Sequence, residues 1–224
     1  MPLTQNDWQV ILLTLEVAAL AVAGALPLAV LAAWALAARF RGRFLLHALV
    51  NLPLALPPVV TGWLLLILCG MQGPVGASLW SRFNIRVAFT TRGAALVCAV
   101  MVFPLMVCAI QLGLEAVDRN VLAAARTLGA GPLDRFFAVT LPLAAPGILM
   151  AIATGFTASL GQFGAVITFA ASIPGQTQTL PLAIYAALQT PDGAADAARL
   201  SLCSGGLAIL GLLAAQRLGH RLRR

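Results

Sequence analysis

Residues 8–38 read WQVILLTLEVAALAVAGALPLAVLAAWALAA, and this stretch decides the class of fold. It contains one charged residue, Glu16, in a run longer than the roughly 20 apolar residues that cross a bilayer core of about 30 Å. Backbone groups in lipid must be paired within the chain itself, so such a run forms a helix. The sequence therefore predicts a membrane-spanning helix near the start of the chain.

Further apolar stretches of comparable length follow at residues 44–71, 93–114, 141–171 and 200–216. A shorter piece, Leu180–Leu188, has roughly half the required length and lies between prolines, which indicates a re-entrant or interfacial segment. We therefore expect residues 1–224 to form a single all-α integral membrane domain in contact with lipid. It should contain about five transmembrane helices.

The composition agrees with this class and excludes others. The chain is 61% hydrophobic and 9% charged, whereas a soluble domain carries about a quarter charged residues. Every basic residue is an arginine, so no lysine is present for a G-x-x-x-x-G-K-[ST] loop, and the chain cannot be a P-loop ATPase. The arginines form no patch with aromatics, which argues against nucleic acid as a partner. The isolated cysteines and the two histidines show no ligand spacing, so we expect no metal and no cofactor.

The arginines also predict the orientation in the membrane. One side of the expected topology carries Arg39, Arg41, Arg43, Arg119, Arg126, Arg135, Arg217, Arg221, Arg223 and Arg224. The other side carries only Arg82, Arg86, Arg92 and Arg199. By the positive-inside rule, the N-terminus lies outside and the C-terminus lies in the cytoplasm.

Prolines interrupt the second expected span, which reads NLPLALPPVVTGW at residues 51–63. Each proline removes a backbone hydrogen bond that lipid cannot replace, and transporters place broken helices of this kind beside a substrate path. A kinked packing helix is the alternative interpretation. In the fourth span Ala151, Gly155 and Ser159 form a ladder of small residues, which favours close approach of another helix.

The loop at residues 115–140 carries the most specific pattern in the chain. Helix-forming residues interrupted by two glycines predict a short helix, a turn and a second helix. Leu122, Ala125 and Leu128 recur at helical spacing beside arginines, so the first helix should be amphipathic. Its apolar side would be buried either against a separate protein or against the membrane domain of the same chain.

The loop resembles the EAA loop of ABC importer permeases. That family pattern is E-A-A, three residues, Gly, nine residues and I-x-L-P, and residues 124–142 read AARTLGAGPLDRFFAVTLP with the same spacing. The sequence departs from the pattern at Ala123, which replaces the glutamate, and at Val139, which replaces the isoleucine. The matching positions are Ala124, Ala125, Gly129, Leu141 and Pro142.

This resemblance implies a type I ABC importer permease fold with a cytoplasmic coupling helix that docks on a separate ABC ATPase subunit. The implied coupling residues are Ala124, Ala125, Arg126, Thr127, Gly129 and Pro142. The chain would then be a transport subunit of a bacterial inner membrane, not an enzyme, served by a periplasmic oxyanion-binding protein. We also expect a homodimer, because about five helices are few to enclose a path.

Other segments, including LPLALPPVVTGWLLL at 52–66 and LGQFGAVITFAASIPGQTQTLPLAIY at 160–185, resemble the molybdate permeases of this family. The sequence departs from them at Gln162 and Gln176, where those proteins ordinarily carry glutamate. The resemblance implies molybdate as the substrate, with sulfate, thiosulfate or tungstate as alternatives. A passive anion channel and a structural membrane scaffold are the alternatives from other classes.

A molybdate dianion would meet no charged residue between Phe136 and Pro191. Its passage is therefore expected to depend on neutral donors and helix termini. The candidate path residues are Thr61, Ser159, Gln162 and Thr168.

Overall fold

The computed structural model describes residues 4–38 and 40–222, and within these ranges the chain contains helices, turns and loops but no strand. The all-α fold expected from the sequence is confirmed. Arg39, Arg223 and Arg224, which contributed to the orientation prediction, lie outside the described residues. The helices are α1 (Gln5–Ala37), α2 (Arg43–Ala55), α3 (Pro58–Cys69), α4 (Pro74–Phe83), α5 (Thr91–Glu115), α6 (Arg119–Thr127), α7 (Pro132–Arg135), the π-helix η1 (Phe136–Thr140), α8 (Leu141–Leu143), α9 (Ala145–Leu160), α10 (Gly164–Ala170), α11 (Leu180–Leu188) and α12 (Ala194–Leu222).

Three of the described helices are long and apolar enough to cross a bilayer unaided, namely α1, α5 and the Ala194–Arg217 part of α12. Two further pairs reach that length only together, and both are bent. The angle between α2 and α3 is 109°, and the angle between Pro132–Leu143 and α9 is 64°. The number of spans is therefore up to five if each bent pair counts as one.

Two of the expected stretches are broken in the structure. Residues 44–71 form α2 and α3, because Leu56 precedes a proline and adopts an extended conformation that ends the helix. Residues 141–171 do not form one helix, since α9 ends at Leu160 and the short α10 follows after a turn. The expected stretches at 8–38, 93–114 and 200–216 fall within or closely match α1, α5 and α12.

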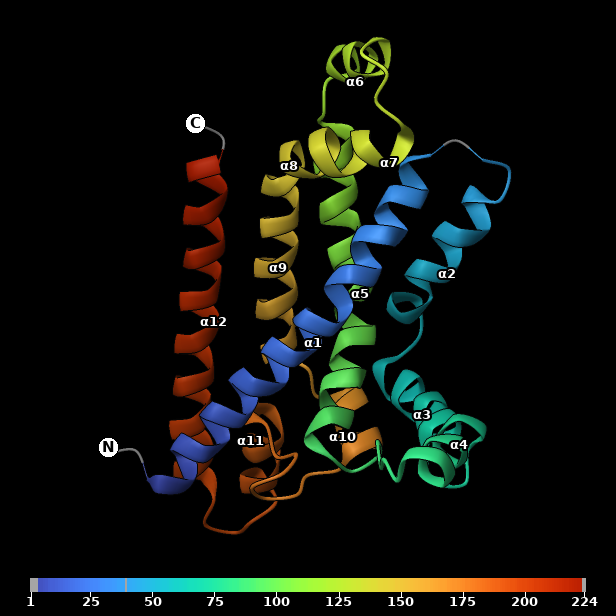
Figure 1. The fold of residues 1–224 in the computed structure, drawn as a ribbon. Helices are drawn as coiled ribbons and strands as arrows, with labels where there is room; N and C mark the ends of the chain where they lie inside the picture. Colours follow the sequence, from blue (N-terminus) through green and yellow to red (C-terminus); the bar gives the residue numbers. More distant parts are fainter. Residues whose placement is uncertain (1–3, 39, 223–224) are drawn as a thin grey trace.

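Helix α1 runs obliquely through the bundle and connects its three buried clusters (Figure 1). Its C-terminal half packs with α5 and α9, its middle part packs with α5 and α10, and its first turns pack with α11 and α12. The hydroxyl of Thr14 on α1 accepts a hydrogen bond from the amide of Leu180 at 2.8 Å, which fixes the start of α11. The whole bundle is thus organised around its first helix.

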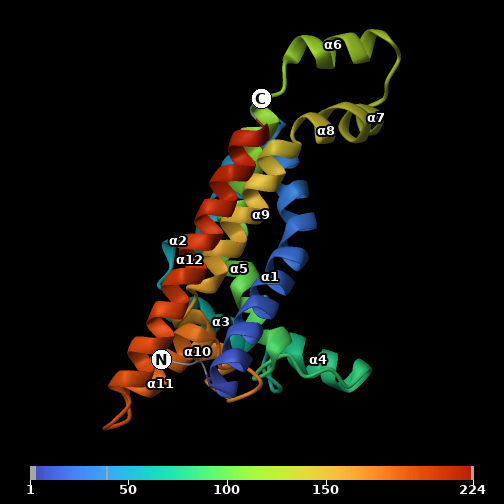
Figure 2. The same cartoon turned by 90° about the vertical axis from the view of Figure 1, so that its left-hand side faces the viewer.

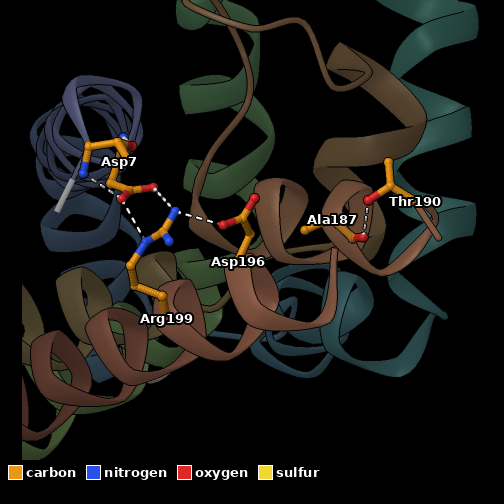
Figure 3. Close-up of polar contacts among 6 residues, drawn as sticks. Asp7, Ala187, Thr190, Asp196 and Arg199 are labelled. Carbon is orange, nitrogen blue, oxygen red and sulfur yellow. Dashed lines mark hydrogen bonds and ion pairs between the residues drawn. The ribbon is translucent and has the colours of Figure 1, made fainter. Parts of the chain in front are cut away.

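An ion pair joins the first helix to the last one (Figure 3). The guanidinium of Arg199 on α12 donates from Nε and Nη2 to the Asp7 carboxylate, at 2.9 and 3.4 Å, and from Nη2 to Asp196 at 3.0 Å. Asp7 is only 2% exposed, and its carboxylate also accepts from the amide of Thr4 at 2.8 Å to cap α1. The carboxylate is therefore buried but fully engaged, which is the condition under which a buried charge is tolerated.

Replacing Arg199 by methionine should destabilise the protein, because Asp7 would stay buried without its cation. We expect a loss of about 3 kcal/mol, seen as a lower apparent melting temperature in detergent. Asp196→Asn is the matched control, since the Asp196 side chain is 60% exposed and its pairing should contribute less than about 1 kcal/mol. Equal melting temperatures for Arg199→Met and the wild type would contradict the importance of this ion pair.

Candidate functional site

Helix α6 stands away from the bundle at the end where α12 finishes (Figures 1 and 2). Asp118 caps its start, with the carboxylate accepting from the amide of Asn120 at 2.8 Å. Its end is a Schellman motif, in which the amide of Gly129 donates to Arg126 O and the amide of Ala130 donates to Ala125 O, both at 3.1 Å. The helix, turn and second helix predicted for this loop are thus present, with α7 as the second helix.

Gly129 sits at the point of this turn where a left-handed backbone is needed. Its φ is +86°, and a Cβ placed there would have open space within 4 Å. A side chain at this position would therefore be strained by its backbone conformation but would not clash inside the chain.

The apolar residues of α6 and of its C-terminal cap are only partly covered by the rest of the chain. Leu122 is half-buried against the bundle, but Val121 is 43% exposed and Leu128 is 87% exposed. The apolar side predicted from the spacing is therefore only partly covered by this chain. Val121 and Leu128 therefore remain exposed on this projecting part of the chain.

The structure places five of the six expected coupling residues together. Ala124, Ala125, Arg126 and Thr127 lie in the last two turns of α6, and Gly129 lies in the turn that follows. Arg126 is exposed, whereas the hydroxyl of Thr127 donates to Ala124 O at 2.8 Å. The sixth residue, Pro142, is exposed in α8, so it lies closer along the chain to the membrane helix α9 than to α6.

Sequence reasoning missed the residue that anchors this loop to the bundle. Phe136 begins the π-helix η1, is 5% exposed, and lies 4.9 Å from the ring of Trp34 on α1. The ring of Phe137 contacts it edge-on at 5.1 Å. Phe136 and Phe137 are the aromatic residues of the loop at 115–140, and this adjacent pair is the sequence signal that could have indicated the anchor.

The two broken segments face each other at the opposite end of the bundle. Helices α3 and α10 pack so closely that a Cβ on Gly62 would lie 2.5 Å from the carbonyl oxygen of Ala165. At the start of α10, a Cβ on Gly164 would lie 3.2 Å from the Cβ of Pro58. The break between α2 and α3 thus lies against the break between α9 and α10.

All four expected path residues lie on or beside this broken pair. Thr61 is on α3, while Ser159, Gln162 and Thr168 follow one another through the end of α9, the break and α10. The Thr61 side chain is 5% exposed, and its hydroxyl is buried with no hydrogen-bond partner among the described residues. Its proton is therefore not engaged by another group of the described residues.

Two of the expected donors are occupied in this conformation. The hydroxyl of Ser159 donates to Gly155 O at 2.8 Å, and that of Thr168 donates to Gly164 O at 2.8 Å. Each hydroxyl therefore presents lone pairs and no proton to the space beside it. No group of three or more His, Cys, Asp or Glu side chains that could hold a metal occurs within the described part of the chain.

A sequence profile described as "Binding-protein-dependent transport system inner membrane component" matches residues 25–224. The chain belongs to this family of inner membrane transport subunits. It is 50% identical over 221 residues to the molybdenum transport system permease protein ModB of Escherichia coli (strain K12), with 98% of this chain and 96% of that protein covered. It is 45% identical over 213 residues to ModB of Haemophilus influenzae, covering 95% and 93% of the two chains.

Two solved transporters show the same fold. A bacterial alginate ABC transporter, solved in complex with an alginate pentasaccharide-bound periplasmic protein, has a TM-score of 0.76 at 17% identity, over 98% of this chain and 80% of that chain. An amino acid ABC transporter with histidines has a TM-score of 0.63 at 17% identity, over 96% and 94%. At this identity the likeness concerns the fold alone.

The close approach of α3 and α10 can be tested at Gly62. Gly62→Ala would place a methyl group against the backbone of Ala165 and force the two helices apart, at a cost of about 1–3 kcal/mol. We expect a lower melting temperature in detergent. Gly24→Ala on α1 is the control, because a Cβ there meets nothing within 4 Å, and it should not lower the melting temperature. A Gly62→Ala protein as stable as this control would show that the packing is loose.

Proposed function

We propose that this chain is the membrane-spanning permease subunit of an ATP-driven ABC importer that carries molybdate across the inner membrane. The observation that carries this proposal is the 50% identity to a molybdenum transport permease over nearly the whole length of both proteins. Helix α6 and the paired breaks in the bundle are consistent with it. In this role the chain translocates the anion and is not an enzyme.

Sulfate is the second candidate substrate, because the chain is also 40% identical to the sulfate transport system permease protein CysT of Salmonella typhimurium. That match extends over 173 residues, 77% of this chain and 62% of that protein, so it supports sulfate less strongly. Thiosulfate and tungstate remain alternatives of the same chemistry. A passive anion channel is disfavoured, since it has no use for a projecting, partly apolar helix such as α6.

The partner of α6 in this proposal is a cytoplasmic ABC ATPase subunit. The chain has no lysine and hence no phosphate-binding loop of its own, so the nucleotide must be hydrolysed elsewhere. The exposed part of α6 with Arg126 and Leu128 would lie in a groove of that subunit. The Phe136–Trp34 contact would transmit its movement to α1.

The same arrangement supports a proposed orientation in the membrane. Helix α6 and the end of α12 lie at one end of the molecule, and α4, α11 and the start of α1 lie at the other (Figure 1). With the arginine-rich loops in the cytoplasm, the N-terminus is periplasmic and the C-terminus cytoplasmic. The periplasmic end would receive an oxyanion-binding protein, and two copies of the chain would enclose one path.

Within that path the anion would pass the broken pair of α3 and α10. We assign Thr61 and Gln162 as the hydrogen-bond donors to the anion, because the hydroxyls of Ser159 and Thr168 donate to carbonyls of their own helices. Ser159 and Thr168 would contribute only after their hydroxyls rotate. A site with so few donors holds an anion weakly, which suits fast release.

Changes in the coupling loop should separate transport from ATP hydrolysis. Gly129→Val adds backbone strain of about 1 kcal/mol or more and a bulky group at the ATPase contact, so the purified complex should lose the ATPase subunit or hydrolyse ATP without uptake. Arg126→Glu should weaken docking through charge reversal. Gly129→Asn is the matched variant, because asparagine tolerates the left-handed conformation, and it should retain more coupling than Gly129→Val. Wild-type uptake with a fully retained ATPase in Gly129→Val and Arg126→Glu would contradict a coupling role.

The substrate can be tested in cells. A strain lacking this gene should lose molybdoenzyme activity in micromolar or lower molybdate and recover it in millimolar molybdate, because bulk anion then enters by less selective routes. Cellular molybdenum, measured by mass spectrometry, should follow the same pattern. Normal molybdenum content combined with defective sulfate assimilation would instead favour sulfate.

A further inference from the structure

A cavity of about 750 Å³ opens where α3 ends, at the end of the molecule opposite α6. Leu66 and Ile67 of α3, with Gly70 directly after it, form one wall. The polar side chains of the lining are Gln72 from the turn between α3 and α4, Arg86 and Thr90 from the segment between α4 and α5, and Gln176 from the turn before α11. Thr61 lies near the start of the same helix α3. The cavity at the end of α3 is therefore at the entrance of the proposed path.

Arg86 is the charged residue of this lining. Its guanidinium carbon lies 4.6 Å from the centroid of the Trp80 ring, so the aromatic face positions the cation. Within the described part of the chain, the ion pairs join other arginines to carboxylates and none involves Arg86. A guanidinium stacked in this way keeps its N–H donors available for an oxyanion.

Gln176 is held beside the cavity by a rigid turn. Its carbonyl accepts from the hydroxyl of Thr91 at 2.7 Å, which ties the turn to the start of α5. The amides of Gln176, Thr177 and Gln178 all donate to the carbonyl of Ile173, at 2.9–3.1 Å. The fully buried Thr177 closes the turn by accepting from the amide of Ile173 at 3.0 Å.

The chemistry of position 176 determines the charge of the cavity. A carboxylate at position 176 would place a negative charge in the same cavity as Arg86 and offset it. Glutamine carries no charge and adds two N–H donors. With Gln176 in place, the lining has a net positive charge and two neutral amide side chains.

We propose that this cavity is the entry vestibule for the oxyanion, where Arg86 attracts the dianion and the amides of Gln72 and Gln176 donate hydrogen bonds to its oxygens. The proposal rests on the proposed function as an oxyanion importer. An anion that the docked binding protein releases would be drawn into a positively charged cavity and would enter the path faster. The vestibule therefore supplies the attraction that the uncharged path beyond it lacks.

The test uses the complete transporter, with permease, ATPase and binding protein, reconstituted in lipid vesicles. Initial molybdate uptake is measured by mass spectrometry at subsaturating molybdate and low ionic strength. Gln176→Glu and Arg86→Gln should each lower uptake by roughly threefold or more, with a smaller change at saturating molybdate. Arg86→Lys should retain most of the uptake, and added salt should reduce wild-type uptake more than that of Arg86→Gln.

Gln178→Glu is the matched control, because it makes the same charge change on the same turn but lines a different hollow with Gln9 and Glu16. Its uptake should stay near the wild-type value. A loss of uptake in Gln178→Glu equal to that in Gln176→Glu would overturn the vestibule, as would loss of the binding protein's stimulation of ATP hydrolysis in Arg86→Gln. Wild-type uptake in both Arg86→Gln and Gln176→Glu would also overturn it. A wild-type transporter that moves no molybdate would instead contradict the proposed function.

Discussion

Lipid offers no hydrogen-bond partner to a peptide group, and the architecture of this bundle depends on that constraint. The prolines between α2 and α3 leave backbone groups that hydrocarbon cannot satisfy. The structure packs α3 against α10, itself a short helix beyond a break, and glycine at position 62 allows the backbones to meet. The two interrupted segments thus pack against each other, so their irregular backbone contacts protein. The hydroxyl of Thr61 is buried between these segments without a hydrogen-bond partner among the described residues, so the same packing that protects the breaks also keeps this donor away from solvent.

Outside the apolar part of the bundle, ordinary capping chemistry determines the shape of the chain. Asp118 and the Schellman turn at Gly129 cap the two ends of α6, so this helix can project with Leu122 packed against the bundle and Val121 exposed. The aromatic contact of Phe136 with Trp34 then ties the far end of the loop to α1. The loop is consequently held by contacts at both of its ends and exposed between them.

The sequence was sufficient to predict the elements that local rules determine. Length and hydropathy predicted α1, α5 and α12, and the spacing around Gly129 predicted the helix and turn in the loop at residues 115–140. It was insufficient where distant segments decide the outcome. The 109° bend exceeds an ordinary proline kink, because α3 turns to pack on α10. The end of α9 at Leu160 involves no proline at all. Ser159 and Thr168 looked like donors, but each hydroxyl donates to a carbonyl of its own helix, which only the folded geometry reveals.

The Asp7–Arg199 pair has a consequence for how the protein is made. The two residues are 192 positions apart, so α1 emerges from the ribosome long before its partner is synthesised. Until α12 enters the membrane, the Asp7 carboxylate has its own helix cap but no cation, and the groove that later holds α12 against the first turns of α1 stays open. A chain that stalls before Arg199 therefore exposes an uncompensated charge and an apolar surface at the membrane boundary. Quality-control proteases can recognise such a surface, and completion of translation removes it.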